Sequence, residues 1–447
     1  MATHPSNSTT AALVVISVNG NHGSTHDFDN FALSLPQQAA NETLPPVFHL
    51  QSTTSQGWQT HDGIVMMATR AAKEAVTWMR ENVLPNMPKG DGDVRCKLYL
   101  SVVGHSLGGL IARYLIKLLL EDASPTNSHT SLLHLLPSDD TNITLHPLTF
   151  MTVCTPHLGS RRTTLNHWTA PFFRSIVANY LKFAAGTTGK ELYMVDGDRL
   201  PNTSNDDEWS DDPAVPLLLR ISHPRSTYVA ALKRFQIVLI SAIQNDIPVG
   251  YLSAAITAIH PYPDLLAHPE NAGGVKIVGV SGFTATIPAQ KCTLLSESDA
   301  SSDTLRAFWM KELFTHTYLD DTPILTPQTV ELAPSVYTSF PTDQTETETD
   351  FPSLTPIDAR KTTLLLYTLH ASLPPLTIRR MDLDFRLSNP LARLATHALA
   401  VGKAEGGWLN VEGGRVARVV GELLARIVLL DYVRMRREGG VRCNEVG

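Results

Sequence analysis

Cysteine is scarce in this chain, with four residues among 447. None of the four is spaced as a CxxC pair, so the sequence predicts neither a bound metal nor a disulfide framework. Basic residues are not in excess, because 43 acidic side chains outnumber 36 lysines and arginines and give a formal net charge of −7. A chain with this balance has no general attraction to nucleic acid, and we expect no nucleic-acid partner.

Long apolar runs are also missing. No stretch approaches the roughly 18 uninterrupted apolar residues that a membrane-spanning helix needs. The first strongly apolar run, Ala12–Val18, is too short and wrongly flanked for a signal peptide. We therefore expect an intracellular protein, either cytoplasmic or peripherally associated with a membrane. The apolar share of 43% is that of an ordinary globular protein with a sizeable core.

Strand-like and helix-like segments alternate along the chain. Short apolar runs rich in β-branched residues predict strands at Leu13–Val18, Val47–Leu50, Lys97–Val103, Leu148–Val153 and Ile237–Ile243. Apolar residues at helical spacing predict helices at Gly63–Asn82, Leu107–Glu121 and about 414–437. This alternation is typical of an α/β fold with a mostly parallel central sheet flanked by helices.

We interpret residues 1–447 as a single domain with insertions. Residues 124–147 are polar with little periodicity and predict a surface loop or insert. Residues 321–356 are rich in Thr, Pro, Asp and Glu without a period, which predicts a disordered insert. Residues 376–437 are interpreted as a C-terminal extended strand, a histidine loop and a final helix.

The strongest motif is Gly104-His105-Ser106-Leu107-Gly108, which lies between the strand at Lys97–Val103 and the helix from Leu107. A sharp turn between a strand and a helix exposes a serine hydroxyl, and glycines on both sides allow close backbone approach. The helix N-terminus adds free N–H donors near the hydroxyl. The motif predicts that Ser106 is a nucleophile and that the Leu107 N–H helps to bind an oxyanion.

A second donor is expected from the loop after the first strand, Asn19–Gly23. A serine esterase needs two backbone donors aimed at the oxyanion, and glycines in this loop let its backbone approach a substrate. We expect the N–H of Gly20 or Asn21 to be that donor.

Several blocks of sequence together resemble the DUF676 family of serine esterases and lipases, which is related to intracellular lipid esterases of yeast and plants. The blocks are Val14–Gly23, Asp62–Ile64, Val103–Tyr114, Thr155–Gly159, Thr188–Leu192 with Asp196, and Tyr228–Val249. Asn19 stands where the family usually has histidine. The resemblance implies an α/β-hydrolase fold, an intracellular esterase acting on a lipid such as a glyceride or lysophospholipid, and no cofactor.

The acid and base of an α/β-hydrolase follow the serine in that order. Asp246 directly follows the strand at Ile237–Ile243, and the resemblance places the family's acid on it. The histidine loop should come later in the chain, which favours His397, and His260 is the alternative. The residues leave open an acyltransferase, a thioesterase or amidase, and a non-catalytic scaffold on the same fold.

Residues 165–215 are a candidate lid. Within them Ala170–Ala185 reads APFFRSIVANYLKFAA, an amphipathic pattern that suits either a lid touching a lipid surface or a core helix packed on the sheet. A lid would allow peripheral contact with a membrane or a lipid droplet.

Overall fold

The computed structural model describes residues 10–87, 96–121, 129–136, 143–160, 185–201, 209–257, 260, 262, 275–281, 356–373, 378–385, 387, 395–403 and 410–437. A seven-stranded sheet forms its centre, with the strand order β2-β1-β3-β4-β5-β7-β6. The strands are β1 Thr10–Val18, β2 Val47–Gln51, β3 Cys96–His105, β4 Ile143–Val153, β5 Gln236–Ala242, β6 Val275–Ser281 and β7 Ile378–Phe385. Neighbouring strands run parallel except at the edge, where β6 is antiparallel to β7. The predicted mostly parallel sheet is confirmed.

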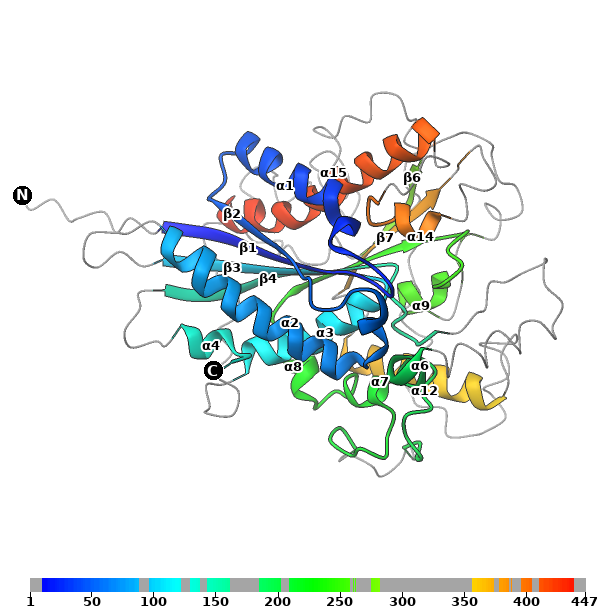
Figure 1. Ribbon diagram of the computed structural model, residues 1–447. Helices are drawn as coiled ribbons and strands as arrows, with labels where there is room; N and C mark the ends of the chain where they lie inside the picture. Colours follow the sequence, from blue (N-terminus) through cyan, green and yellow to red (C-terminus); the bar gives the residue numbers. More distant parts are fainter. Residues whose placement is uncertain are drawn as a thin grey trace, which may run out of the picture.

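Helices cover both faces of the sheet (Figure 1). On one face lie α1 Asp29–Asn41 and α15 Asn410–Arg437, which pack against each other. The opposite face carries α2 Ile64–Trp78, α3 Leu107–Leu120, α8 Thr227–Leu232 and α12 Pro356–Ser372. The remaining short elements are η1 Thr25–Phe28, η2 Gly57–His61, η3 Met79–Val83, η4 Leu84–Asn86, α4 Leu132–Leu135, α6 Gly186–Leu192, α7 Leu217–Arg220, α9 Tyr251–Ala255 and α14 Thr396–Leu399.

The side chains of β1 show why this sheet is buried on both faces. Val14 and Ile16 belong to the core beneath α2 and α3, whereas Leu13 and Val15 belong to the core beneath α1 and α15. Alternate residues of a strand point to opposite faces, so an unbroken apolar run is what a strand covered on both sides requires. None of the helices in the described ranges combines the length and apolar character needed to cross a membrane.

An ion pair fixes α15 to the sheet. Arg379 of β7 donates to the two carboxylate oxygens of Asp431 at 2.6 and 2.5 Å, and both side chains are 1% exposed. Thr149 of β4 donates to the same carboxylate at 2.7 Å. Buried charges persist only when they are paired and hydrogen-bonded, so this contact locks the helix over β4 and β7.

Two predicted inserts fall partly on described residues. The segment 124–147 contains α4 and the first residues of β4, which begins at Ile143 rather than at the predicted Leu148. These first β4 residues are only partly buried, so they lack the apolar run that marks the rest of the strand. Of the predicted insert 321–356, residues 321–355 lie outside the described ranges and Pro356 begins α12. Residues 165–184 and 202–208 of the candidate lid also lie outside them.

Candidate active site

Ser106 occupies the turn between β3 and α3. Its backbone has φ 54° and ψ −128°, a conformation that non-glycine residues rarely adopt. The turn is held by the Ser106 N–H, which donates to the carbonyl of Val153 at 2.9 Å, and by the N–H of Gly109, which donates to the carbonyl of Ser106 at 3.0 Å. The strand, the strained serine and the helix are arranged as the motif predicts.

Glycine is required on both sides of this serine. A Cβ on Gly104 would lie 2.4 Å from the Cα of Gly109, and one on Gly108 would lie 2.1 Å from the carbonyl oxygen of Val18. Backbone atoms fill both spaces, so a side chain at either glycine would push the turn at Ser106 away from β1 and α3.

The loop after β1 lies directly against Ser106. A Cβ on Gly20 would be 2.8 Å from Ser106 Cβ and 3.3 Å from Ser106 Oγ, so the backbone of Gly20 passes beside the hydroxyl. The loop is anchored on the segment before α2. The hydroxyl of Thr60 donates to Asn21 Oδ1 at 2.8 Å and accepts from the His22 N–H at 3.2 Å. Gly20 therefore lies beside the Ser106 hydroxyl, and Thr60 holds Asn21 and His22 of the same loop.

The side chain of Asn19 also holds the loop after β1 in place. Its side-chain amide donates to the carbonyl of Ser55 at 2.7 Å, and the residue is buried. Asn19 is therefore a polar anchor between the loop after β1 and the segment before η2.

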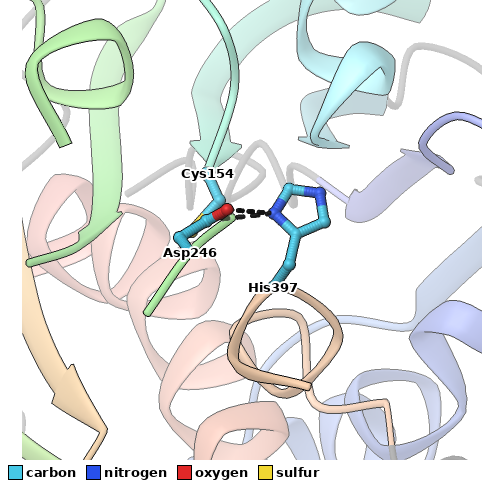
Figure 2. Close-up of side chains that lie close together, drawn as sticks. All are labelled: Cys154, Asp246 and His397. Atoms are coloured by element: carbon cyan, nitrogen blue, oxygen red, sulfur yellow. Dashed lines mark hydrogen bonds and ion pairs between the residues drawn. The ribbon is translucent and has the colours of Figure 1, made fainter. Parts of the chain in front are cut away.

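Asp246 and His397 lie side by side at the edge of the sheet that carries Ser106, although 151 residues separate them (Figure 2). His397 Nδ1 lies 2.9 and 3.0 Å from the two oxygens of the Asp246 carboxylate. The Val249 N–H donates to Asp246 Oδ1 at 3.0 Å, and the carboxylate side chain is 2% exposed. This geometry holds the Nδ1–H tautomer of His397 and leaves its Nε2 to accept a proton.

His105 connects the turn at Ser106 to the segment around His397. Its Nε2–H donates to the backbone carbonyl of His397 at 2.9 Å, and the two rings lie 4.6 Å apart. Burial and then the nearby His397 lower the pKa of His105 to about 3, so its ring stays neutral. No hydrogen bond joins Ser106 Oγ to His397 in the described part of the chain, and His105 makes the contact between the turn and His397. From the sequence alone, His105 was identified only as part of the turn.

His260, the alternative base, is held elsewhere. Its Nε2 bonds to the backbone carbonyl of Ile243 at 2.9 Å, and its ring packs 4.5 Å from that of Tyr251. Burial lowers the pKa of His260. The structure therefore pairs Asp246 with His397 and not with His260.

Cys154, which sequence reasoning did not single out, completes the cluster in Figure 2. Donor atoms of Cys154, Asp246 and His397 all lie within 4.8 Å of one another, and these residue types are able to hold a zinc ion. Burial, and next the charge of Asp246, raise the pKa of the thiol well above its usual range. A protonated thiol is able to donate a hydrogen bond to a neighbouring carboxylate.

Comparison with known proteins places this chain in a family. Residues 8–257, more than half of the chain, match the family model described as "Putative serine esterase (DUF676)". Ser106 and Asp246 lie within the matched residues, and His397 lies beyond them. No curated protein matches the chain.

Among solved structures, one similar chain is the phospholipase PlaB from Legionella pneumophila in complex with thio-NAD. The two chains share 14% identity with a TM-score of 0.29, and the alignment covers 52% of this chain and 38% of the phospholipase. A likeness this weak carries no argument about activity. The family match over more than half of the sequence is sufficient by itself, and the chain belongs to the DUF676 family of serine esterases.

Proposed function

We propose that this protein hydrolyses carboxylic esters through an acyl-enzyme on Ser106. The observation that carries the proposal is the Asp246–His397 pair, at 2.9 and 3.0 Å, on the sheet edge where Ser106 sits in a strained turn. A histidine oriented by a buried carboxylate, on the same edge of the sheet as a strained serine, is the arrangement that activates a hydroxyl nucleophile when substrate binds.

The reaction follows from these positions. Ser106 Oγ attacks the ester carbonyl carbon while His397 Nε2 takes the hydroxyl proton, and Asp246 stabilises the resulting imidazolium. The N–H groups of Leu107 and of Gly20 or Asn21 bind the oxyanion. The intermediate collapses when the C–O bond to the alcohol breaks and His397 protonates the leaving oxygen. Water then attacks the acyl-enzyme by the same route and frees the acid.

We further propose that the ester is a lipid, such as a glyceride or a lysophospholipid. Six large apolar side chains are exposed in the described part of the chain: Leu33, Trp58, Val65, Met66, Val195 and Ile247. Ile247 is the neighbour of Asp246, and Trp58, 78% exposed, packs 5.2 Å from His22 of the oxyanion loop.

Val65 and Met66 belong to the first turn of α2, and Val195 lies just beyond α6. These two helices meet at Gly63, whose N–H donates to Thr188 at 3.0 Å. Exposed apolar side chains next to Asp246 and next to the loop after β1 suit an acyl chain or peripheral contact with a membrane or lipid droplet.

The proposal is tested with p-nitrophenyl esters of increasing acyl length. We expect hydrolysis by the wild type, faster turnover of longer acyl chains, and loss of activity with an unchanged fold in Ser106→Ala. Activity retained by Ser106→Ala would overturn the assignment of the nucleophile. Product analysis with an added acceptor alcohol separates hydrolysis from acyl transfer, since a transferase forms a new ester.

The lipid part of the proposal needs a separate comparison. Trp58→Ser is expected to reduce turnover of a micellar lipid ester several-fold and to leave a soluble short ester unaffected. Leu33→Ser is the matched control, because Leu33 is also exposed, at 65%, but lies on α1. Equal effects of the two substitutions on the micellar ester would contradict the role of Trp58 in binding the lipid.

A further inference from the structure

Cys154 has an unusual backbone for its side chain. It directly follows β4, has φ +47°, and is completely buried. Its N–H donates to the carbonyl of Ile240 at 2.8 Å, which ties the turn to β5. Glycine would relieve the strain of a backbone in the left-handed region. A cysteine at such a position therefore suggests that its side chain has a role.

That side chain meets the proposed catalytic acid. Figure 2 shows Cys154 beside Asp246, with the imidazole of His397 facing the carboxylate. The thiol sulfur lies within 4.8 Å of an Asp246 carboxylate oxygen, and burial raises the pKa of the thiol, so the S–H is available as a donor. The carboxylate also accepts hydrogen bonds from His397 Nδ1–H and from the Val249 N–H.

We propose that Cys154 is a positioning residue, whose S–H donates to the Asp246 carboxylate and fixes its rotation toward His397 Nδ1. This inference rests on the proposed function of Ser106, Asp246 and His397. A buried carboxylate that loses a donor becomes less well solvated and free to turn, which weakens the alignment of the imidazole. The effect falls on the chemical step, because Cys154 contacts the acid and not the substrate.

The first test is spectroscopic and needs no activity. The infrared S–H stretching band of Cys154 is isolated as the difference between wild type and Cys154→Ala, and that of Cys96, a buried core thiol at the start of β3, as the difference from Cys96→Ala. We expect the Cys154 band at lower frequency than the Cys96 band and displaced upward in Asp246→Asn. A Cys154 band that is unchanged in Asp246→Asn would overturn the proposal.

The second test is kinetic, with a soluble short ester. Cys154→Ala is expected to lower kcat about tenfold with KM unchanged, since hydrogen bonds to charged groups are among the stronger ones. Cys154→Ser restores a donor at the same strained backbone position and should recover most of the loss. Cys96→Ala is the matched control and should leave kcat unchanged.

The kinetic proposal fails if Cys154→Ala keeps wild-type kcat, if KM rises instead, or if serine restores nothing. These outcomes differ from failure of the proposed function, in which the wild type itself does not hydrolyse esters. The infrared comparison still decides the thiol–carboxylate contact in that case, and Cys154→Ser serves both tests if the alanine variant does not fold.

Discussion

A methyl group at Gly20 is a sharp steric probe of the site. The added Cβ would lie 2.8 Å from Ser106 Cβ, 3.2 Å from the His105 carbonyl oxygen and 3.3 Å from Ser106 Oγ. The backbone of Gly20 is not in the left-handed region, so alanine brings no conformational strain of its own. Either the loop Asn19–Gly23 or Ser106 must move, and this displacement is confined to the site.

The expected size of the effect follows from the donor that is displaced. Loss of one oxyanion donor lowers kcat by about 10²–10³. Overpacking at a tight contact costs about 1–3 kcal/mol of folding free energy, which lowers the melting temperature by only a few degrees in a protein of this size. Gly20→Ala is therefore expected to lose most of its kcat while remaining folded.

The assay is hydrolysis of a short p-nitrophenyl ester, with thermal unfolding followed on the same samples. Gly414→Ala in α15 is the matched control, because no atom lies within 4 Å of its added methyl group and alanine in a helix is slightly stabilising. Wild-type kcat in Gly20→Ala would refute the placement of the oxyanion loop against Ser106.

Three further predictions concern the acid, a buried glutamate and the buried ion pair. Asp246→Asn is expected to lower kcat on the short ester by about 10⁴ with an unchanged melting temperature, because His397 loses its preferred tautomer; a loss below about tenfold contradicts this. Burial raises the pKa of Glu191 from 4.5 to about 7. The folded protein therefore holds a proton that the unfolded chain releases, and stability is lost as pH rises through this range. Melting temperatures of Glu191→Gln should decline less than those of the wild type across that window, and parallel curves would contradict the raised pKa. Arg379→Met leaves the Asp431 carboxylate buried without its cation, and urea unfolding should show a loss of about 3–5 kcal/mol; an unchanged midpoint would show that the pair is not buried as described.

Much of the sheet was predictable because its strands are apolar on both faces. The runs that predicted β1, β3, β4 and β5 end at the sheet edge that carries Ser106 and Asp246. Their order along the chain, followed by a late histidine, favoured His397 over His260. The nucleophile turn was predictable because its glycines and helix start are local features.

Other elements lacked such a local signal. Helix α1 contains Pro36 in its interior, which argues against a helix when only the sequence is read. Helix α12 begins within the segment predicted as a disordered insert, and its apolar residues Leu364, Leu365 and Leu366 are consecutive rather than spaced around a helix face. The edge strand β6 is antiparallel, and its position depends on pairing with β7.

The contacts that refine the site are long-range. His105 and His397 are separated by 292 residues, and Cys154 meets Asp246 only because β4 and β5 are neighbours. No spacing rule in the sequence joins these residues, because the sheet order brings them together. A cysteine after a strand reads as a buried core thiol until its neighbour is known.

The central claim is that Ser106 is an activated nucleophile, and labelling of the folded protein with a fluorophosphonate probe tests it most directly. We predict a single adduct that peptide mass spectrometry places on Ser106, absent in Ser106→Ala and strongly slowed in His397→Ala. Absence of an adduct on Ser106 in folded wild-type protein would contradict the account and favour a non-catalytic scaffold on the same fold.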